Sequence, residues 1–394
     1  MSRSYTSRQT AAVIAATTTM AVTWGPRSAF GLFLTPLAAH GVPIGQTAFA
    51  IALHNIAWGV SQPFAGAWAD RNGASRVQAL GIVLFAAGFA LPAFFTAGWA
   101  VMLGLGILTG LGTALTGFSV SMAGAARCFR PDQRSTAVGI CSAGGSAGQL
   151  IALPLIALLL AVGGPSLAFL AIAGLALIAI PLGWPVDRAV LDPPTPRKSI
   201  AAVRHALGER PFVLLTLGFF TCGLQLAFLS THLPGYLSLC GMPAAAGAWA
   251  LTIVAAANVL GNYLCGRAGA RIPPQLVLAG LYAIRGAAIL LFWLAPKNDI
   301  SLALFAAVMG LTWLGTIPLT NGVIARLYGV GDLGALFGIC FLSHQLGSFV
   351  GAWAGGLVFE FSGSYDIAFI ATGAFGFIAA AFNAPIRMPR VAVA

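Results

Sequence analysis

Two arginines, Arg27 and Arg285, lie inside long apolar stretches of the sequence, and no carboxylate accompanies either of them there. The chain has nine acidic residues, which all fall in connecting segments or at the ends of the apolar stretches. A charged side chain at the centre of a bilayer costs roughly 2.5–3.5 kcal/mol on insertion scales. Such a cation persists where it lines water or meets an anion, and a planar guanidinium binds both oxygens of a carboxylate. The pattern therefore predicts a site for a small organic anion.

Other polar side chains within the apolar stretches are candidates to complete this site. Two histidines are suited to binding or proton transfer, although a lone histidine in an apolar helix is more often a packing residue. For the amides, hydrogen bonding between helices, worth about 1 kcal/mol or less, is an equal alternative. For the tryptophans, packing is the default and a cavity wall the alternative. The predicted substrate-binding residues are Arg27, Trp24, Asn55, Gln149, Gln225, His232, Asn258, Asn262, Trp313, His344 and Gln345.

The composition shows that the apolar stretches are membrane segments. Of the 394 residues, 59% are hydrophobic and 7% are charged, whereas soluble domains contain about 25% charged residues. Lipid must therefore be the main solvent of the folded chain. The six cysteines are dispersed without a C-x-x-C spacing, so we expect no metal site, no cofactor and no redox chemistry. The sequence also shows no nucleophile–base pair and no phosphate-binding loop, which argues against an enzyme.

The lengths of the apolar stretches predict an all-α protein with twelve transmembrane helices. A helix needs about 20 residues to cross the hydrocarbon core, and twelve stretches are long enough. They cover residues 11–39, 45–69, 76–96, 98–124, 135–162, 165–184, 211–239, 243–265, 275–295, 299–327, 333–361 and 364–385. A linker rich in proline and charge follows the sixth stretch. We therefore predict two six-helix bundles, residues 1–185 and 211–394, joined by a cytoplasmic linker, residues 186–210.

The distribution of basic residues predicts the orientation of these helices. Cytoplasmic loops of membrane proteins are enriched in Lys and Arg. If the N-terminus is cytoplasmic, 17 of the 20 basic residues fall in internal segments, and the external loops contain Lys297 alone. The net charge of +11 is therefore a topology signal, and no nucleic-acid partner is expected. We predict a monomer in the cytoplasmic (inner) membrane with both termini in the cytoplasm.

An internal repeat indicates that the two halves are related. Gly139-Ile140-Cys141 in the fifth stretch recurs as Gly338-Ile339-Cys340 in the eleventh, and Gly148 corresponds to Gly347 at the same offset of 199 residues. The position of each pair within its stretch agrees as well as the spacing. Matched halves of this kind are typical of secondary transporters, so the repeat predicts two pseudo-symmetric bundles.

The loop after the second stretch carries a family motif. Its residues, Gly66-Ala67-Trp68-Ala69-Asp70-Arg71-Asn72-Gly73, resemble the signature of the major facilitator superfamily. The resemblance implies the twelve-helix fold and transport by alternating access. It also implies that the loop is a cytoplasmic latch, with gating roles for Asp70, Arg71 and Arg76. Simple charge anchoring would need only the arginines, so Asp70 with its two glycines favours the latch.

The first stretch narrows the resemblance to one branch of the superfamily. Trp24-Gly25-Pro26-Arg27-Ser28-Ala29-Phe30-Gly31-Leu32-Phe33 resembles the monocarboxylate and oxalate/formate porters, in which a cation in helix one takes part in substrate binding and coupling. The resemblance implies the same role for Arg27. It also places Arg285 on helix nine, in the outer layer of helices. For Arg285 we therefore expect an intramembrane structural role, with hydrogen bonds to backbone carbonyls or to polar groups between helices.

The eighth stretch departs from the pattern of the branch. Animal monocarboxylate transporters carry an Asp there and, four residues later, an Arg, whereas Asn258 and Asn262 stand at the matching positions in this sequence. The usual carboxylate for proton coupling is therefore missing. Coupling through His232, through His344 or through the proton of the substrate itself are the alternatives.

These observations predict a secondary active transporter of small organic anions, foremost monocarboxylates, that works by alternating access with coupling to protons. The expected partners are a carboxylate substrate, protons and the lipid bilayer. The alternative function is an efflux carrier for drugs or metalloid compounds. Drug carriers often hold an acid within the membrane, and metalloid carriers favour clustered cysteines. The sequence offers neither, which places the anion carrier first.

Overall fold

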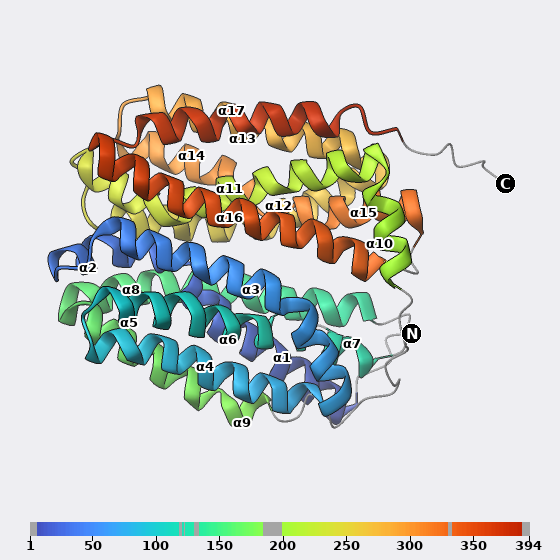
Figure 1. Cartoon of the computed structure of the whole chain (residues 1–394), viewed down its shortest axis with the longest axis horizontal. Helices are drawn as coiled ribbons and strands as arrows, with labels where there is room; N and C mark the ends of the chain where they lie inside the picture. Colours follow the sequence, from blue (N-terminus) through green and yellow to red (C-terminus); the bar gives the residue numbers. More distant parts are fainter. Residues whose placement is uncertain are drawn as a thin grey trace. The chain divides into compact units, whose positions relative to one another are not determined.

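The computed structural model describes residues 6–117, 120–121, 123–129, 134–183, 199–329 and 333–387. These residues form helices and connecting turns, as the sequence predicts for a membrane protein (Figure 1). The chain divides into two compact units, Met1–Thr195 with Gly247–Thr252, and Pro196–Ala246 with Ile253–Ala394. We call them the N-terminal and C-terminal units. The predicted domain boundaries at residues 185 and 211 stay predictions, and residues 186–198 of the linker lie outside the described residues.

The helices of the N-terminal unit follow the first six predicted stretches. They are α1 (Ser7–Arg27), η1 (Phe30–Phe33), α2 (Leu34–Ala39), α3 (Ile44–Asn72), α4 (Ala74–Phe94), α5 (Gly98–Val101), η2 (Met102–Leu108), α6 (Thr109–Thr116), α7 (Ala123–Arg127), α8 (Arg134–Ile178) and α9 (Ile180–Gly183). Gly164 interrupts α8 with a φ of +70°, a conformation that glycine adopts without steric cost. α8 therefore supplies two successive spans.

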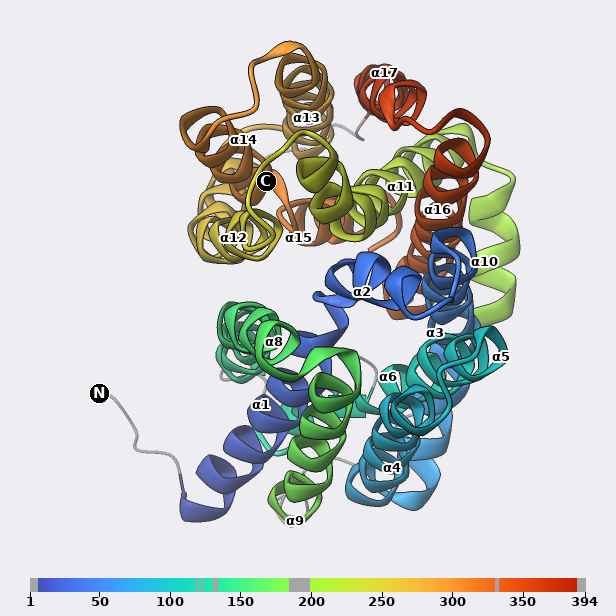
Figure 2. The ribbon, with the colours of Figure 1, turned by 90° about the vertical axis from the view of Figure 1, so that its left-hand side faces the viewer.

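The helices of the C-terminal unit follow the last six stretches. They are α10 (Ser199–Leu207), α11 (Arg210–Leu239), α12 (Ala246–Arg271), α13 (Pro274–Leu294), α14 (Asp299–Thr312), α15 (Thr316–Tyr328), α16 (Leu333–Ser362) and α17 (Asp366–Asn383). Within this unit α11 packs along α16, and α13 packs along α17 (Figure 2).

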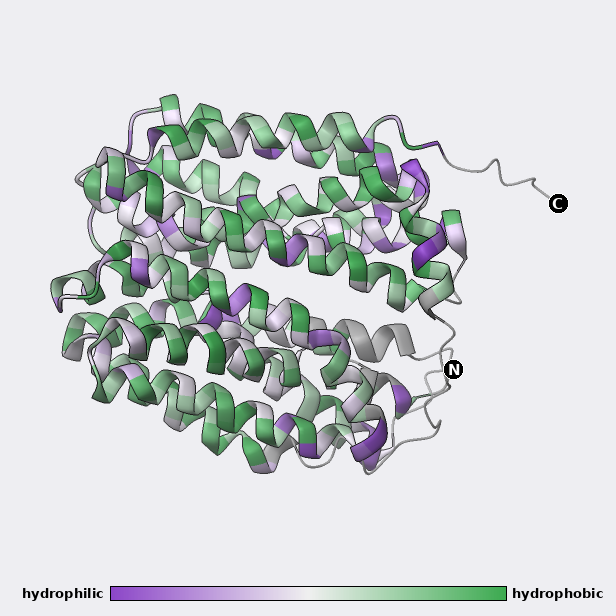
Figure 3. Ribbon diagram, viewed as in Figure 1, coloured by the Kyte–Doolittle hydropathy of each residue, from purple (hydrophilic) through white to green (hydrophobic). Residues whose placement is uncertain are grey.

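Twelve helical spans result when broken helices are grouped. The segments α1, η1 and α2 form one span, as do α5, η2 and α6, and likewise α14 and α15. Nine helices of the described chain are long and apolar enough to cross a membrane by composition, with both halves of α8 counted together. Because α8 contains two spans, these nine account for ten of the twelve. The other two spans, which contain α1 and α3, are more polar. Figure 3 shows apolar residues along the middle of the helices and many of the hydrophilic ones toward their ends. The predicted twelve-helix fold is confirmed.

Equivalent contacts in the two units reproduce the sequence repeat. In the N-terminal unit Thr17 Oγ1 lies 3.9 Å from Cys141 Sγ, and in the C-terminal unit Thr216 Oγ1 lies 3.4 Å from Cys340 Sγ. Both members of the pair are displaced by the predicted 199 residues. The pairs join α1 to α8 and α11 to α16, so these two helix pairs are structural equivalents.

The repeated glycines explain how closely these helices approach. A Cβ atom on Gly148 would collide with the backbone of Ala21, and one on Gly347 with the backbone of Phe220, which is again 199 residues further on. Small residues of this kind let helix backbones come together in a membrane.

Candidate functional site

A break in the first span positions Arg27. The ring of Pro26 removes one backbone donor from the last turn of α1. The helix ends at Arg27, where the N–H of Ser28 caps the carbonyls of Trp24 and Gly25. The chain then continues as the tighter helix η1. Arg27 is therefore the last residue of α1, at an interruption within a membrane span.

The guanidinium of Arg27 lies against two tryptophan rings. Its Cζ atom is 5.1 Å from the ring centre of Trp24 on the same helix and 4.7 Å from that of Trp58 on α3. The two rings meet edge to face, with centres 5.3 Å apart, and both side chains are buried. We call Trp24, Arg27 and Trp58 the Arg27 cage.

The cage leaves the hydrogen-bonding capacity of Arg27 unused. Among the residues that the structure describes, none forms an ion pair or a hydrogen bond with its guanidinium, and its Nε atom is buried without a partner. Each of the two cation–π contacts contributes about 0.5–2 kcal/mol, but neither uses an N–H donor of the guanidinium. The N–H donors of the guanidinium are therefore available to an anion.

His54 and Asn55 on α3 lie in the same unit as the cage. The ring of His54 contacts Trp58, with centres 6.3 Å apart, and packs edge-on against Phe30. Its Nδ1 atom lies 2.8 Å from Thr109 Oγ1, whose own proton goes to the carbonyl of Leu105. Nδ1–H must therefore be the donor, which leaves Nε2 as a buried acceptor without a partner among the described residues.

Two of the predicted residues of the N-terminal unit, Asn55 and Gln149, lie outside the Arg27 cage. Asn55 donates to the carbonyl of Ile51, 2.9 Å away and one turn back on the same helix. Gln149 is buried on α8, the helix that packs along α1. Trp24 is part of the cage. The binding roles of these residues stay predictions.

The C-terminal unit contains a second broken span. The sequence predicted one stretch over residues 299–327, but residues Trp313–Gly315 leave the helix between α14 and α15. Pro318 explains this break in the helix, because proline has no N–H to donate to the carbonyl of Leu314. Irregular backbone in a membrane must find polar partners within the protein.

Arg285 and Asn258 supply the partners for this break. The fully buried guanidinium of Arg285 on α13 donates to the carbonyls of Thr312 and Trp313. On the other side, Asn258 Oδ1 on α12 accepts from the N–H of Leu314 at 3.0 Å. A third bond runs from Arg285 Nη1 to Cys222 Sγ at 3.2 Å. Arg285 therefore caps irregular backbone through its two Nη atoms, while its Nε atom is buried without a partner among the described residues.

Two more predicted residues of the C-terminal unit hold helices together. The ring of His232 on α11 has partners at both nitrogens, the carbonyl of Ala352 at 2.7 Å and the hydroxyl of Tyr365 at 3.4 Å. Gln225 Nε2 donates to the carbonyl of Thr372 at 3.2 Å. These bonds link α11 to its neighbours in the unit.

The remaining predicted residues lie in different surroundings. His344 on α16 is half-buried, stacks on Phe341, and has Nδ1 2.9 Å from Gln345 Oε1. Asn262 on α12 is half-buried and has an unpartnered Oδ1 atom. Trp313 contributes its carbonyl to the Arg285 site.

The latch residues lie around the turn at Gly73, between α3 and α4. Asp70 lies in the last turn of α3, but its side chain is outside the described residues. Arg71 and Arg76 are exposed on either side of the turn at Gly73. The gating roles of all three stay predictions.

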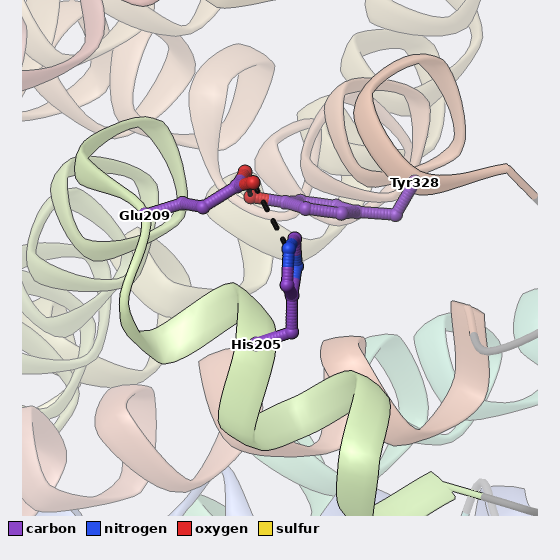
Figure 4. A network of polar contacts seen from close by, with 3 residues as sticks. All are labelled: His205, Glu209 and Tyr328. Carbon is purple, nitrogen blue, oxygen red and sulfur yellow. Dashed lines mark hydrogen bonds and ion pairs between the residues drawn. The ribbon is translucent and has the colours of Figure 1, made fainter.

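A polar contact ties the start of the C-terminal unit to the end of one of its spans (Figure 4). Tyr328 at the end of α15 donates to Glu209 Oε2 at 2.8 Å. Glu209 also lies 3.7 Å from His205 on α10. This part-buried group connects α10 and the start of α11 to the end of α15.

The set of predicted binding residues lacks two residues that the structure brings to the arginines. The contact of Trp58 with Arg27 joins α3 to the end of α1. The contact of Cys222 with Arg285 joins two helices whose residues no spacing rule connects. No local sequence signal could have found the second contact.

The fold and the buried cations together define a polytopic membrane transporter. The chain belongs to the Major Facilitator Superfamily, because the model of that family matches residues 12–313. Transporters of this family bind small-molecule substrates within the membrane.

Several known proteins are similar to this chain. The uncharacterized MFS-type transporter YcxA of Bacillus subtilis is 26% identical over 364 residues, which cover 86% of this chain and 85% of YcxA. Human monocarboxylate transporter 11 is 28% identical over 365 residues, with 89% of this chain and 77% of the relative covered. The predicted resemblance to the superfamily and to its monocarboxylate branch is confirmed.

A solved structure supports the same fold. The crystal structure of a bacterial homolog to the human lysosomal transporter Spinster, in an inward-facing and occupied conformation, matches with a TM-score of 0.76. The match covers 96% of this chain and 97% of the other at 14% identity. At this identity the likeness concerns the fold alone.

Proposed function

We propose that this protein transports small monocarboxylates across the cytoplasmic membrane by alternating access, and that Arg27 binds the carboxylate. One observation carries the proposal: Arg27 is a cation within a membrane span whose guanidinium has no hydrogen bond or ion pair among the described residues. A carboxylate suits this guanidinium because two parallel N–H···O bonds match its two oxygens. The similarity to monocarboxylate transporter 11 supports the same substrate class.

The Arg27 cage favours a substrate with one acidic end. The two tryptophan rings contact the guanidinium without using its N–H donors, which stay available for hydrogen bonds to a carboxylate. The aromatic walls are apolar, so they suit a short hydrocarbon body and oppose a second charge. We therefore place monocarboxylates ahead of dicarboxylates.

Transport is proposed to be coupled to protons. No carboxylate of the described chain contacts either buried arginine, so a carboxylate cannot be the proton carrier beside them. His232 is a weaker candidate than His344, because both of its ring nitrogens have partners within the helix bundle. His344 is half-buried and close to the Arg285 site.

Uptake into proteoliposomes tests the proposal. The purified protein is reconstituted and supplied with labelled formate, acetate, lactate, pyruvate or oxalate, with and without an imposed pH gradient. We expect gradient-driven uptake of at least one monocarboxylate and a loss of at least about 30-fold in Arg27→Ala, the effect of truncating one partner of a buried charge pair.

Arg267→Ala is the matched control, because Arg267 is an exposed arginine that contacts a ring, that of Tyr263. It should transport like the unmodified protein. Equal loss in both variants would contradict a specific role for Arg27. Export of drugs or metalloid compounds without carboxylate uptake would favour the alternative carrier, and uptake that ignores the gradient would overturn the coupling.

A further inference from the structure

His54 carries an unfilled hydrogen-bond acceptor inside the N-terminal unit. The side chain is buried, with 1% of the residue exposed. Its Nδ1–H donates to Thr109 Oγ1 at 2.8 Å, because the hydroxyl proton of Thr109 already goes to the carbonyl of Leu105. Nε2 of the neutral ring is therefore an acceptor, and it has no partner among the residues that the structure describes.

The other fully buried histidine provides a contrast. His232 on α11 has partners at both ring nitrogens, the carbonyl of Ala352 and the hydroxyl of Tyr365. A buried polar atom without a partner costs free energy, so most such atoms in proteins are paired. One nitrogen is enough to tie His54 to Thr109. The unfilled second nitrogen indicates a partner that comes from outside the chain.

The ring of His54 lies beside the Arg27 cage. The rings of His54 and Trp58 have centres 6.3 Å apart, and Arg27 Cζ lies 4.7 Å from the centre of the same Trp58 ring. Phe30, three residues after Arg27, packs edge-on against His54 with ring centres 5.0 Å apart. The charge of Arg27 also acts on the ring of His54. One small ligand can therefore use the N–H donors of Arg27 and the Nε2 acceptor of His54.

We propose that His54 accepts a hydrogen bond from a hydroxyl group of the substrate and so selects hydroxylated monocarboxylates. A carboxylate bound to Arg27 is ionised and has no proton to donate, so the donor must be another group of the ligand. A hydroxyl group on the short body of the acid supplies this donor, whereas a methyl or a keto group does not. An amino group would bring a second positive charge beside Arg27. The inference rests on the role proposed for Arg27 and adds the class of substrate.

The unfilled acceptor should discriminate between acids of the same carbon skeleton. An acid without the hydroxyl group leaves Nε2 of His54 unpaired, whereas the hydroxy acid fills it. A site that bonds a substrate hydroxyl rejects the analogue that lacks it for this reason. The net gain of one neutral hydrogen bond corresponds to a preference of about 2- to 12-fold in affinity.

Two substitutions separate the acceptor from the tie to Thr109. The side-chain nitrogen of asparagine is bonded to Cγ, as is Nδ1 of histidine, so His54→Asn keeps a donor for Thr109 and removes the acceptor at Nε2. The side-chain oxygen of glutamine lies one bond further from the backbone, so His54→Gln keeps an acceptor near the position of Nε2. If His54 only held Thr109, neither variant would change the preference between two acids. His40→Asn is the control, because His40 is an exposed histidine of the same unit.

Titration calorimetry of the purified protein tests the inference. Lactate is compared with propionate and pyruvate, and 3-hydroxybutyrate with butyrate. In at least one of these matched sets, we expect the hydroxy acid to bind about 2- to 12-fold more tightly to the unmodified protein, to His54→Gln and to His40→Asn. His54→Asn should bind all members of that set equally and should keep the affinity of the unmodified protein for the unsubstituted acid.

Equal affinities within both matched sets of the unmodified protein would overturn the inference and leave the proposed function intact. A preference that survives in His54→Asn would overturn the role of His54. If His54→Asn does not fold, His54→Phe, which keeps a ring without an acceptor, takes its place. Failure of every monocarboxylate to bind the unmodified protein would instead overturn the proposed function, and the inference with it.

Discussion

The two intramembrane arginines differ in what surrounds them. The difference indicates a structural role for Arg285 and supports the binding role that we propose for Arg27. Arg285 is fully buried and donates to two carbonyls and a thiol. Arg27 is half-buried, touches two tryptophan faces and has no hydrogen-bond partner among the described residues. Arg27 ends α1 at a break in its own span, whereas Arg285 lies within α13 and faces the break between α14 and α15. Arg285 satisfies the broken backbone, and Arg27 is the cation for which we propose a ligand.

The contrast between the two arginines predicts that a substitution of Arg285 causes the largest loss of stability. Arg285→Leu leaves the carbonyls of Thr312 and Trp313 without their donor and should destabilise the protein by about 2–6 kcal/mol, because each unsatisfied buried group costs about 1–3 kcal/mol. Thermal unfolding in detergent and the yield of monodisperse protein measure this loss. A variant as stable as the unmodified protein would show that Arg285 does not support the break between α14 and α15.

A substitution of Asn258, on the other side of the same break, should cause a smaller loss of stability. Asn258→Leu leaves the N–H of Leu314 without its acceptor and should cost about 1–3 kcal/mol. Asn258→Asp keeps an oxygen at this position and serves as the conservative control. If both variants unfold at the same temperature as the unmodified protein, Asn258 is free for the binding role that the sequence predicted.

At the Arg27 cage, a change at Trp58 should affect binding more than folding. Trp58→Leu removes one of the two ring faces over the guanidinium, a contact worth about 0.5–2 kcal/mol. We expect the affinity for a carboxylate to fall by about 2- to 30-fold, because the guanidinium of Arg27 is then less well oriented. Trp58→Phe should retain most of the affinity. Titration calorimetry with a transported carboxylate measures both variants.

The smallest expected effect is that of Arg27 on the stability of the empty protein. Arg27→Leu loses two cation–π contacts but also removes a buried charge, and these terms nearly cancel. We expect the free energy of unfolding to change by less than about 1 kcal/mol. A loss as large as that of Arg285→Leu would contradict the contrast between the two arginines.

The sequence predicted the scaffold because hydrophobic length and the repeat act along the whole chain, while the orientation inferred from charge asymmetry stays a prediction. The offset of 199 residues even recurs in the contacts of Cys141 and Cys340. It did not predict the break at residues 313–315, because the stretch stays apolar there and Pro318 is tolerated in membrane helices.

The details of each arginine site depended on packing between distant segments. Trp58 lies on a different helix from Arg27, and Cys222 is far from Arg285 in the sequence. A single sequence shows that each arginine is buried in an apolar stretch, but not which backbone or ring faces it. For this reason the sequence left both the structural and the binding role open for Asn258 and His232.

A thermal-shift measurement tests the central claim most directly. The purified protein and Arg27→Gln are heated with and without an excess of each short carboxylate, with the matching uncharged amide as a control. A ligand at 100 times its dissociation constant stabilises the folded state by about 2.7 kcal/mol. We predict such a shift for the unmodified protein with at least one monocarboxylate, and none for Arg27→Gln or the amide. An equal carboxylate shift in Arg27→Gln would contradict the assignment of Arg27 as the anion site.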